Sequence, residues 1–202
     1  MKQYPSITRN FFEIKNAFIF DKPDGSNLRF EWSRKQGWCK YGTRKRLFDE
    51  TDPIFGGAIE LFHATLADNL SRVFTQERWD RATAFAEYFG PNSFAGYHDP
   101  VEPKQLQLID ICHYRYGFLD PKDYMKLFGS LNIAPLIERA NWTRGYVDRV
   151  WAGEVEGISF EGVVAKLGGG DKAVRAKAKT QAWIERVRAG FNAEEAERII
   201  NS

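Results

Sequence analysis

The sequence predicts an α+β protein in which antiparallel strands form the sheets and helices pack outside them. Leu28, Phe30 and Trp32 alternate with polar residues, which is typical of a strand with one buried face. Between residues 58 and 74, apolar residues recur at intervals of three and four, the spacing of an amphipathic helix. The 202 residues are 43% hydrophobic, which is enough for one compact domain with a substantial core.

Short apolar or alternating runs predict the other strands in order along the chain. A buried strand is expected at 17–20. The strand expected at 37–41 would follow the alternating strand as the next strand of a meander. The further strands are expected at 82–88, 106–112, 161–167 and 173–179. The last two are separated by Gly168-Gly169-Gly170. We expect a hairpin turn there rather than a phosphate-binding loop, because no Gly-Lys-Ser/Thr sequence follows the glycines.

Capping residues predict the remaining helices. Asp120 followed by Pro121 is typical of a helix start, and this helix is expected to run to about residue 131. A second helix is expected over 143–151. The chain after Thr180 is also expected to be helical, with Asn192 as the cap of a final helix over 193–200.

Composition excludes several classes of protein. No run of about 18 apolar residues is present and the first residues lack an apolar signal core, so we expect a cytoplasmic protein with no membrane partner. The two cysteines have no zinc-type spacing. The net charge of +2 is mild, but basic residues gather in two clusters that either border a phosphate-binding groove or form solvated faces: Arg34, Lys35, Lys40, Arg44, Lys45 and Arg46, and Lys172, Arg175, Lys177, Lys179, Arg186 and Arg188.

Lys22 is the candidate nucleophile. It ends an apolar strand just before the turn Pro23-Asp24-Gly25, so its amine is expected to project from the strand end into a cleft. A lysine becomes nucleophilic near neutral pH when burial or nearby cations lower its pKa. Lys177 and Lys179 lie on one side of a later strand and could do this while binding a triphosphate. The alternative is an exposed lysine beside a type I turn.

Carboxylates within apolar runs are candidate binding residues. Glu87 and Asp110 interrupt predicted strands, and a buried carboxylate needs a partner such as a ribose hydroxyl, a metal ion or a lysine. The alternative for Glu87 is a residue that faces solvent. Glu161 and Lys166 are five positions apart, an odd offset that places them on opposite faces of a strand unless a bulge intervenes. The scattered histidines and the six tryptophans are expected to be structural.

Taken in order, these segments resemble the motifs of the covalent nucleotidyltransferase superfamily, and more narrowly the nick-sealing, double-stranded-RNA type of ATP-dependent RNA ligase of T-even phage. Asn27, five residues after the lysine, is the choice of RNA ligases rather than DNA ligases. A stretch of this subgroup is matched by 123–125 with 134–136. The six motif matches are 22–25, 40–44, 85–91, 108–110, 161–166 and 177–179.

The resemblance implies a role for each matching residue. Lys22 would form a lysyl-AMP adduct and Glu87 would contact the ribose. Glu161 and Asp110 would serve a metal ion, with Glu161 alternatively positioning the lysine. The other nucleotide-binding positions would be Asp24, Asn27, Arg44, Ile109, Lys166, Lys177 and Lys179.

Two features depart from the family pattern. Ile109 stands where the family usually stacks an aromatic ring on adenine. Only a short segment follows Lys179, where the phage enzyme has a helical C-terminal domain. We therefore expect an antiparallel-sheet nucleotidyltransferase (ATP-grasp-like adenylation) domain with peripheral helices over 1–180, a helical tail over 181–202, and a possible partner protein that supplies the missing domain. Tyr4 is aligned, over a short match, with a functional N-terminal tyrosine of the subgroup.

The implied activity is ATP-dependent RNA ligation. ATP and Mg²⁺ or Mn²⁺ would be the cofactors, and the partner would be RNA with a 5′-phosphate and a 3′-hydroxyl end. The alternatives are a minimal DNA ligase, a capping-type guanylyltransferase, and a non-catalytic module that binds nucleic-acid ends. Asn27 disfavours a DNA ligase. The ordered set of motif residues disfavours a non-catalytic module.

Overall fold

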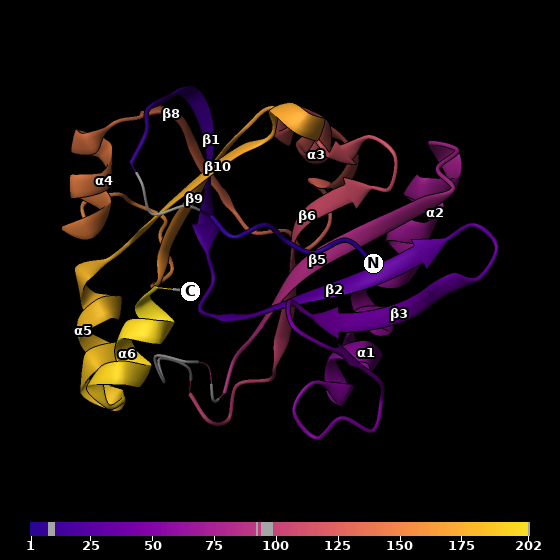
Figure 1. The fold of residues 1–202 in the computed structure, drawn as a ribbon, viewed down its shortest axis with the longest axis horizontal. Helices are drawn as coiled ribbons and strands as arrows, with labels where there is room; N and C mark the ends of the chain where they lie inside the picture. Colours follow the sequence, from indigo (N-terminus) through magenta and orange to yellow (C-terminus); the bar gives the residue numbers. More distant parts are fainter. Residues whose placement is uncertain (8–10, 92, 94–98, 202) are drawn as a thin grey trace.

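The computed structural model describes residues 1–7, 11–91, 93 and 99–201, and its strands form two antiparallel sheets. One sheet has four strands in the order β10-β9-β1-β8, and the other has six in the order β4-β3-β2-β5-β6-β7 (Figure 1). The strands are β1 (Ile14–Lys22), β2 (Gly25–Ser33), β3 (Gly37–Thr43), β4 (Leu47–Phe48), β5 (Arg81–Phe89), β6 (Gln105–His113), β7 (Gly117–Phe118), β8 (Leu136–Trp142), β9 (Gly162–Leu167) and β10 (Val174–Lys179).

The helices lie outside the sheets, so the predicted α+β class is confirmed (Figure 1). Two pairs of them join almost without a break: α1 continues through a π-helical turn into α2, and α5 is followed closely by α6. The helical segments are α1 (Gly56–Phe62), η1 (the π turn, His63–Ala67), α2 (Asp68–Gln76), α3 (Pro121–Phe128), α4 (Arg144–Trp151), η2 (a 3-10 turn, Gly170–Lys172), α5 (Gln181–Gly190) and α6 (Ala193–Ile200).

The chain passes from one sheet to the other immediately after Lys22. β1 pairs with β8 and β9, whereas β2, only two residues later, pairs with β3 and β5. The Pro23–Asp24 link is therefore a crossing between sheets rather than a hairpin turn. Trp183 in α5 donates from Nε1 to Asp24 Oδ1 at 2.9 Å, which holds this crossing against the C-terminal helices.

The six-stranded sheet is covered on both faces. α1, η1, α2 and α3 pack on one face, over a core that includes Leu28, Phe30 and Phe62. On the other face, the N-terminal segment crosses in front of β5 (Figure 1), and Tyr4 packs edge-on against Phe85 with ring centroids 5.2 Å apart. β2 was expected to have one exposed face, but this segment buries that face, and Glu31 is only 2% exposed.

Capping explains where most helices begin, and the predicted caps at Asp120 and Asn192 are confirmed. The Asp120 carboxylate accepts from the Lys122 amide at 2.9 Å, and Thr143, Thr180 and Asn192 cap α4, α5 and α6. Two predictions were wrong in detail: α3 ends at Phe128 rather than near residue 131, and β8 was not expected. β8 escapes notice because its exposed and half-buried residues show no regular alternation. No helix in the described ranges is long and apolar enough to cross a membrane.

Candidate active site

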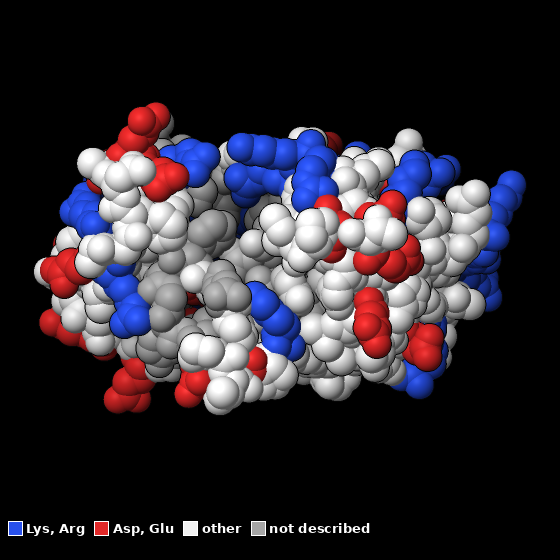
Figure 2. Space-filling view, turned by 90° about the horizontal axis from the view of Figure 1, so that it is seen from below, with Lys and Arg blue, Asp and Glu red and all other residues white. Residues whose placement is uncertain are grey.

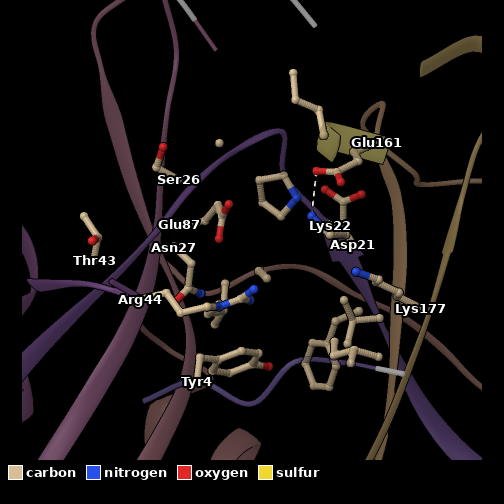
Figure 3. A pocket seen from close by; sticks show the side chains of 18 of the residues that line it. Tyr4, Asp21, Lys22, Ser26, Asn27, Thr43, Arg44, Glu87, Glu161 and Lys177 are labelled. Atoms are coloured by element: carbon tan, nitrogen blue, oxygen red, sulfur yellow. Dashed lines mark ion pairs between the residues drawn. The ribbon is translucent and has the colours of Figure 1, made fainter. Parts of the chain in front are cut away.

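A cavity of about 460 Å³ opens where the two sheets meet. One part of its wall is apolar, with Phe20, Ile109 and Val164. The other part carries charged side chains from both sheets (Figure 3). The cavity thus offers an apolar surface that suits a nucleobase and a charged surface that suits phosphates.

Lys22 projects into this cavity from the end of β1. Its Nζ lies 2.6 Å from Glu161 Oε2, and the two side chains point toward each other in Figure 3. Burial favours the neutral amine, but the charges of Glu161, Glu87 and Asp24 outweigh it and raise the pKa of Lys22 above its usual value. The expectation that neighbouring lysines lower this pKa was therefore wrong, because the charges of the nearby carboxylates outweigh the effect of burial.

Glu161 reaches Lys22 because of the glycine that follows it. Gly162 has φ of +149°, and a Cβ there would lie 2.0 Å from the Ala178 carbonyl oxygen, so only glycine fits. This backbone conformation breaks the strand alternation, and β9 begins one residue after Glu161. Glu161 and Lys166 consequently both line the cavity despite their odd spacing.

Lys177 and Lys179 lie on the same side of β10, as their spacing predicts. Lys179 Nζ contacts Glu161 Oε1 at 3.0 Å and lies 4.0 Å from the centre of the Trp183 ring. Lys177 lines the cavity and points into it (Figure 3). Burial, followed by the charges of Lys179 and Lys22, lowers the pKa of Lys177 to about 8. Lys177, unlike Lys22, is therefore a cavity lysine whose positive charge weakens as pH rises through about 8.

Glu87 lines the cavity from β5, opposite Asn27 of β2. Burial raises the pKa of Glu87 to about 7; Lys22 opposes this shift and Glu161 adds to it. The carboxylate is only 7% exposed, which excludes the alternative that it faces solvent. Its position beside Lys22 and Asn27 leaves it able to accept hydrogen bonds from a bound molecule in the cavity.

Asp110 lies outside the cavity, although the resemblance predicts a metal-binding role for it. Its Oδ2 accepts from Arg175 Nη2 at 2.7 Å and from the Tyr4 hydroxyl at 3.2 Å, and Lys166 Nζ lies 3.4 Å away. Asp110 does not line the cavity, and the described residues include no group of three or more acidic, histidine or cysteine side chains that could hold a metal. The geometry instead makes Asp110 the buried anion that joins β6, β10 and the N-terminal segment.

Lys166 is held at the apolar part of the cavity. Its Nζ donates to the Ile109 carbonyl oxygen and lies 4.8 Å from the centre of the Phe20 ring. Burial is the largest influence on the Lys166 amine and lowers its pKa. The Ile109 side chain lines the same region, together with Tyr4 from the N-terminal segment. Ile109 and Tyr4 therefore line the region where the family usually places an aromatic residue that stacks on adenine.

Arg44 reaches the cavity from the loop after β3 (Figure 3). Its Nε is buried and has no hydrogen-bond partner, a condition that costs free energy unless a ligand accepts from it. Lys45 and Arg46 line the same part of the cavity. This basic loop is suited to bind an anion such as a phosphate.

The sequence did not identify two residues that shape the site, and it named a third, Arg175, only as a member of a basic cluster. Trp183 and Ile199 of the C-terminal helices line the cavity, and the Ile199 carbonyl accepts from Lys179 Nζ at 3.3 Å. Arg175 binds Asp110 from β10 with Nε at 3.0 Å and Nη2 at 2.7 Å. Strand periodicity was a signal for Arg175, because it lies on the same side of β10 as Lys177 and Lys179. Periodicity gave no signal for Trp183.

Comparison with known proteins gives structural neighbours but no sequence match. No family model and no curated protein matches the sequence. An RNA ligase of Naegleria gruberi solved with ATP and Mn superposes with a TM-score of 0.64 at 13% identity, covering 86% of this chain and 52% of its own. For the same ligase solved with PPi, the values are 0.63, 14%, 87% and 52%.

An archaeal ATP-dependent RNA ligase superposes with a TM-score of 0.66 at 16% identity. The superposition covers 92% of this chain and 50% of that one. The chain thus spans about half the length of these neighbours. At such identities the likeness concerns the fold, and it confirms the predicted antiparallel-sheet nucleotidyltransferase fold.

Proposed function

We propose that this protein is an ATP-dependent RNA ligase that forms a lysyl-AMP intermediate on Lys22. The observation that carries the proposal is the position of Lys22 Nζ, 2.6 Å from Glu161, in a cavity that also receives Lys177 and Glu87. The structural neighbours described above are RNA ligases, two of them solved with ATP and Mn or with PPi. A lysine nucleophile, a carboxylate beside it and flanking cations are what transfer of AMP to an amine requires.

In the first step, Lys22 Nζ attacks the α-phosphorus of ATP. A nitrogen–phosphorus bond forms, the bond from the α-phosphorus to the bridging oxygen breaks, and pyrophosphate leaves. Lys22 must lose a proton to attack, and Glu161 Oε2 is the acceptor in contact with its Nζ. Lys177 and the basic loop at Arg44 line the cavity and stabilise the negative charge on the phosphates, and Lys179 adds positive charge from its position against Glu161.

Glu161 is the carboxylate that fits a divalent metal ion such as Mg²⁺ or Mn²⁺. Mg²⁺ is commonly bound by one or two carboxylates together with substrate phosphates, so the lack of a multi-carboxylate cluster in the described ranges is compatible with binding alongside ATP. Such an ion supplies charge neutralisation at the phosphates. Asp110 is assigned no metal in this proposal, because it does not line the cavity, whereas Glu161 does.

In the later steps, AMP moves from Lys22 to the 5′-phosphate of an RNA end, and a 3′-hydroxyl then displaces AMP to join the strands. Lys45 and Arg46 lie at the cavity wall and can bind the incoming phosphates. Figure 2 shows Lys and Arg side chains at the rim of a hollow near the middle of the face seen from below. Binding through such contacts weakens as salt is added.

Within this activity we propose the nick-sealing subgroup and a division of the chain. Residues 1–180 would form the adenylyltransferase domain, and the helices after Thr180 would be a short tail that closes the site through Trp183 and Ile199. The chain spans about half the length of the RNA ligases it superposes on, and we propose that efficient sealing needs a further domain in addition to these residues. We place the protein in the cytoplasm with its RNA substrate.

The test is adduct formation by the purified protein. Wild-type protein and Lys22→Ala would be incubated with α-labelled ATP and a divalent metal, with GTP in parallel, and the adduct site would be mapped by mass spectrometry. We expect an acid-labile AMP adduct on Lys22 that disappears in the variant. Adduct formation on Lys177, or no adduct on a folded protein, would overturn the proposal, and a GTP-only adduct would indicate a capping enzyme. RNA and DNA nicks would then be compared as substrates.

A further inference from the structure

The turn that joins β6 to β7 presents two exposed tyrosines. Tyr114 is 53% exposed and Tyr116 is 69% exposed, although large aromatic side chains are usually mostly buried. Neither residue lines the cavity that holds Lys22. We call residues 113–117 the tyrosine turn.

The tyrosine turn is held in one conformation by His113. The His113 Nδ1 accepts from the backbone amides of Arg115 and Tyr116, both at 3.1 Å. The Tyr116 ring stacks on the imidazole, with centroids 4.7 Å apart and planes 21° apart, and the Trp79 ring meets the imidazole edge-on at 5.2 Å. Burial, together with Arg115, lowers the pKa of His113, so the neutral ring that can accept these bonds is favoured.

One face of the Tyr116 ring is thereby occupied and the other is open to solvent. Its stack on His113 accounts for the inner face, and the 69% exposure leaves the outer face accessible. A rigid aromatic face that needs no reordering can bind a flat partner with a small entropy cost. Nucleobases stack on such rings whatever their sequence.

Two cations lie against Tyr114, the second ring of the tyrosine turn. The guanidinium of Arg81 lies 4.9 Å from the centre of the Tyr114 ring, and Lys2 Nζ lies 5.5 Å from it. Arg115 is itself an exposed residue of the turn. The nearby carboxylate of Asp80 lies 3.7 Å from Arg34, so it is already balanced by a cation. An exposed ring beside positive charge matches the chemistry of a base and its phosphate.

The N-terminal segment contacts both the cavity and the tyrosine turn. Tyr4 lines the cavity and Lys2 contacts Tyr114. Two residues of extended chain span at most about 7 Å. A nucleic-acid strand with its end in the cavity is therefore within a few nucleotides of the turn.

We propose that the tyrosine turn is a stacking platform for an unpaired base of single-stranded RNA, with Tyr116 as the stacking ring and Arg81 and Arg115 as phosphate contacts. The identity of the nucleic acid as RNA rests on the proposed function, whereas the stacking does not. The platform would hold an unpaired stretch of RNA that leaves the duplex near the nick to be sealed. Paired bases in a duplex are stacked on one another and do not reach the ring.

The test measures binding of a labelled single-stranded oligoribonucleotide of mixed sequence with a 5′-hydroxyl, and of a blunt duplex of the same length, both without ATP. We expect Tyr116→Ala to weaken binding of the single strand by at least about fivefold, the factor that corresponds to about 1 kcal/mol per stacked base. Binding of the duplex should change by less than about twofold. Tyr116→Phe keeps the aromatic ring and should bind like wild type. Arg81→Gln should reduce the salt dependence by about one phosphate contact.

Trp151→Ala is the matched control, because Trp151 is an exposed aromatic residue of α4 outside the tyrosine turn. It should leave binding unchanged, and all variants should retain the AMP adduct and the wild-type melting temperature. Unchanged single-strand binding in Tyr116→Ala, equal losses with single strand and duplex, or a loss in Tyr116→Phe would each overturn the platform. Failure of the Lys22 adduct with preserved loss in Tyr116→Ala would overturn the ligase assignment alone.

Discussion

Replacing Arg175 with methionine tests whether the buried Asp110 cluster holds the two sheets together. Arg175 is 9% exposed and Asp110 is 2% exposed. The guanidinium makes two hydrogen bonds to Asp110 Oδ2, and its Cζ lies 4.1 Å from the centre of the Phe118 ring. Methionine can keep the packing against the ring but leaves the carboxylate without its strongest partner.

The expected cost follows from the charge that remains. Removing one partner of a buried ion pair typically lowers the free energy of unfolding by about 3–5 kcal/mol. Lys166 and Tyr4 still contact Asp110, so we expect the lower end, about 3 kcal/mol. With a urea m-value of about 2 kcal/mol per molar, the unfolding midpoint would fall by about 1.5 M.

Urea unfolding followed by circular dichroism measures this change. Arg188→Met is the matched control, because Arg188 pairs with Glu197 at 3.0 Å while their side chains are 58% and 53% exposed. An exposed pair contributes about 0–1 kcal/mol. Adding Asp110→Asn to Arg175→Met should recover part of this stability, since it removes the buried charge that has lost its strongest partner. Equal, small losses in Arg175→Met and Arg188→Met would refute the reasoning.

Three further predictions concern the cavity. Glu87 has its usual pKa of 4.5 when unfolded and about 7 when folded, so the folded state keeps a proton that the unfolded chain loses. Stability should therefore fall by about 3 kcal/mol as pH rises from about 4.5 to 7, and Glu87→Gln should remove this slope in urea unfolding. Lys177, with a pKa of about 8, loses its charge as pH rises, so affinity for a non-hydrolysable ATP analogue should drop between pH 7 and 9, and Lys177→Arg should remove the drop because arginine stays charged. Trp183→Phe removes the hydrogen bond to Asp24 and should lower the free energy of unfolding by about 2 kcal/mol, whereas Trp151→Phe should have little effect.

Each of these has a result that would contradict it. A pH slope of stability that persists in Glu87→Gln would mean that another group carries it. Affinity for the ATP analogue that stays constant from pH 7 to 9 in wild type would show that the Lys177 charge does not bind the phosphates. An equal free energy of unfolding for Trp183→Phe and wild type would show that the hydrogen bond from the indole to Asp24 does not stabilise the crossing between the sheets.

Much of the fold and the composition of the site followed from the sequence. Strand alternation, the spacing of apolar residues over 58–74, and the caps at Asp120 and Asn192 depend on neighbours in the chain, and each element formed where these signals stand. The motif order also placed Lys22, Glu87 and the β10 lysines together as candidates. The periodicity of side chains along a helix or strand depends on nearby residues only, so it can be read from the sequence.

Only the tertiary structure decided how these residues interact. Asp110 meets Arg175 across 65 positions and Asp24 meets Trp183 across 159, and no local pattern encodes such pairings. The sign of the Lys22 pKa shift was also mispredicted from sequence, because it depends on how far the charges of Glu161, Glu87 and Asp24 outweigh the effect of burial in the folded chain. Electrostatic effects vary with distance and burial, and folding alone sets both.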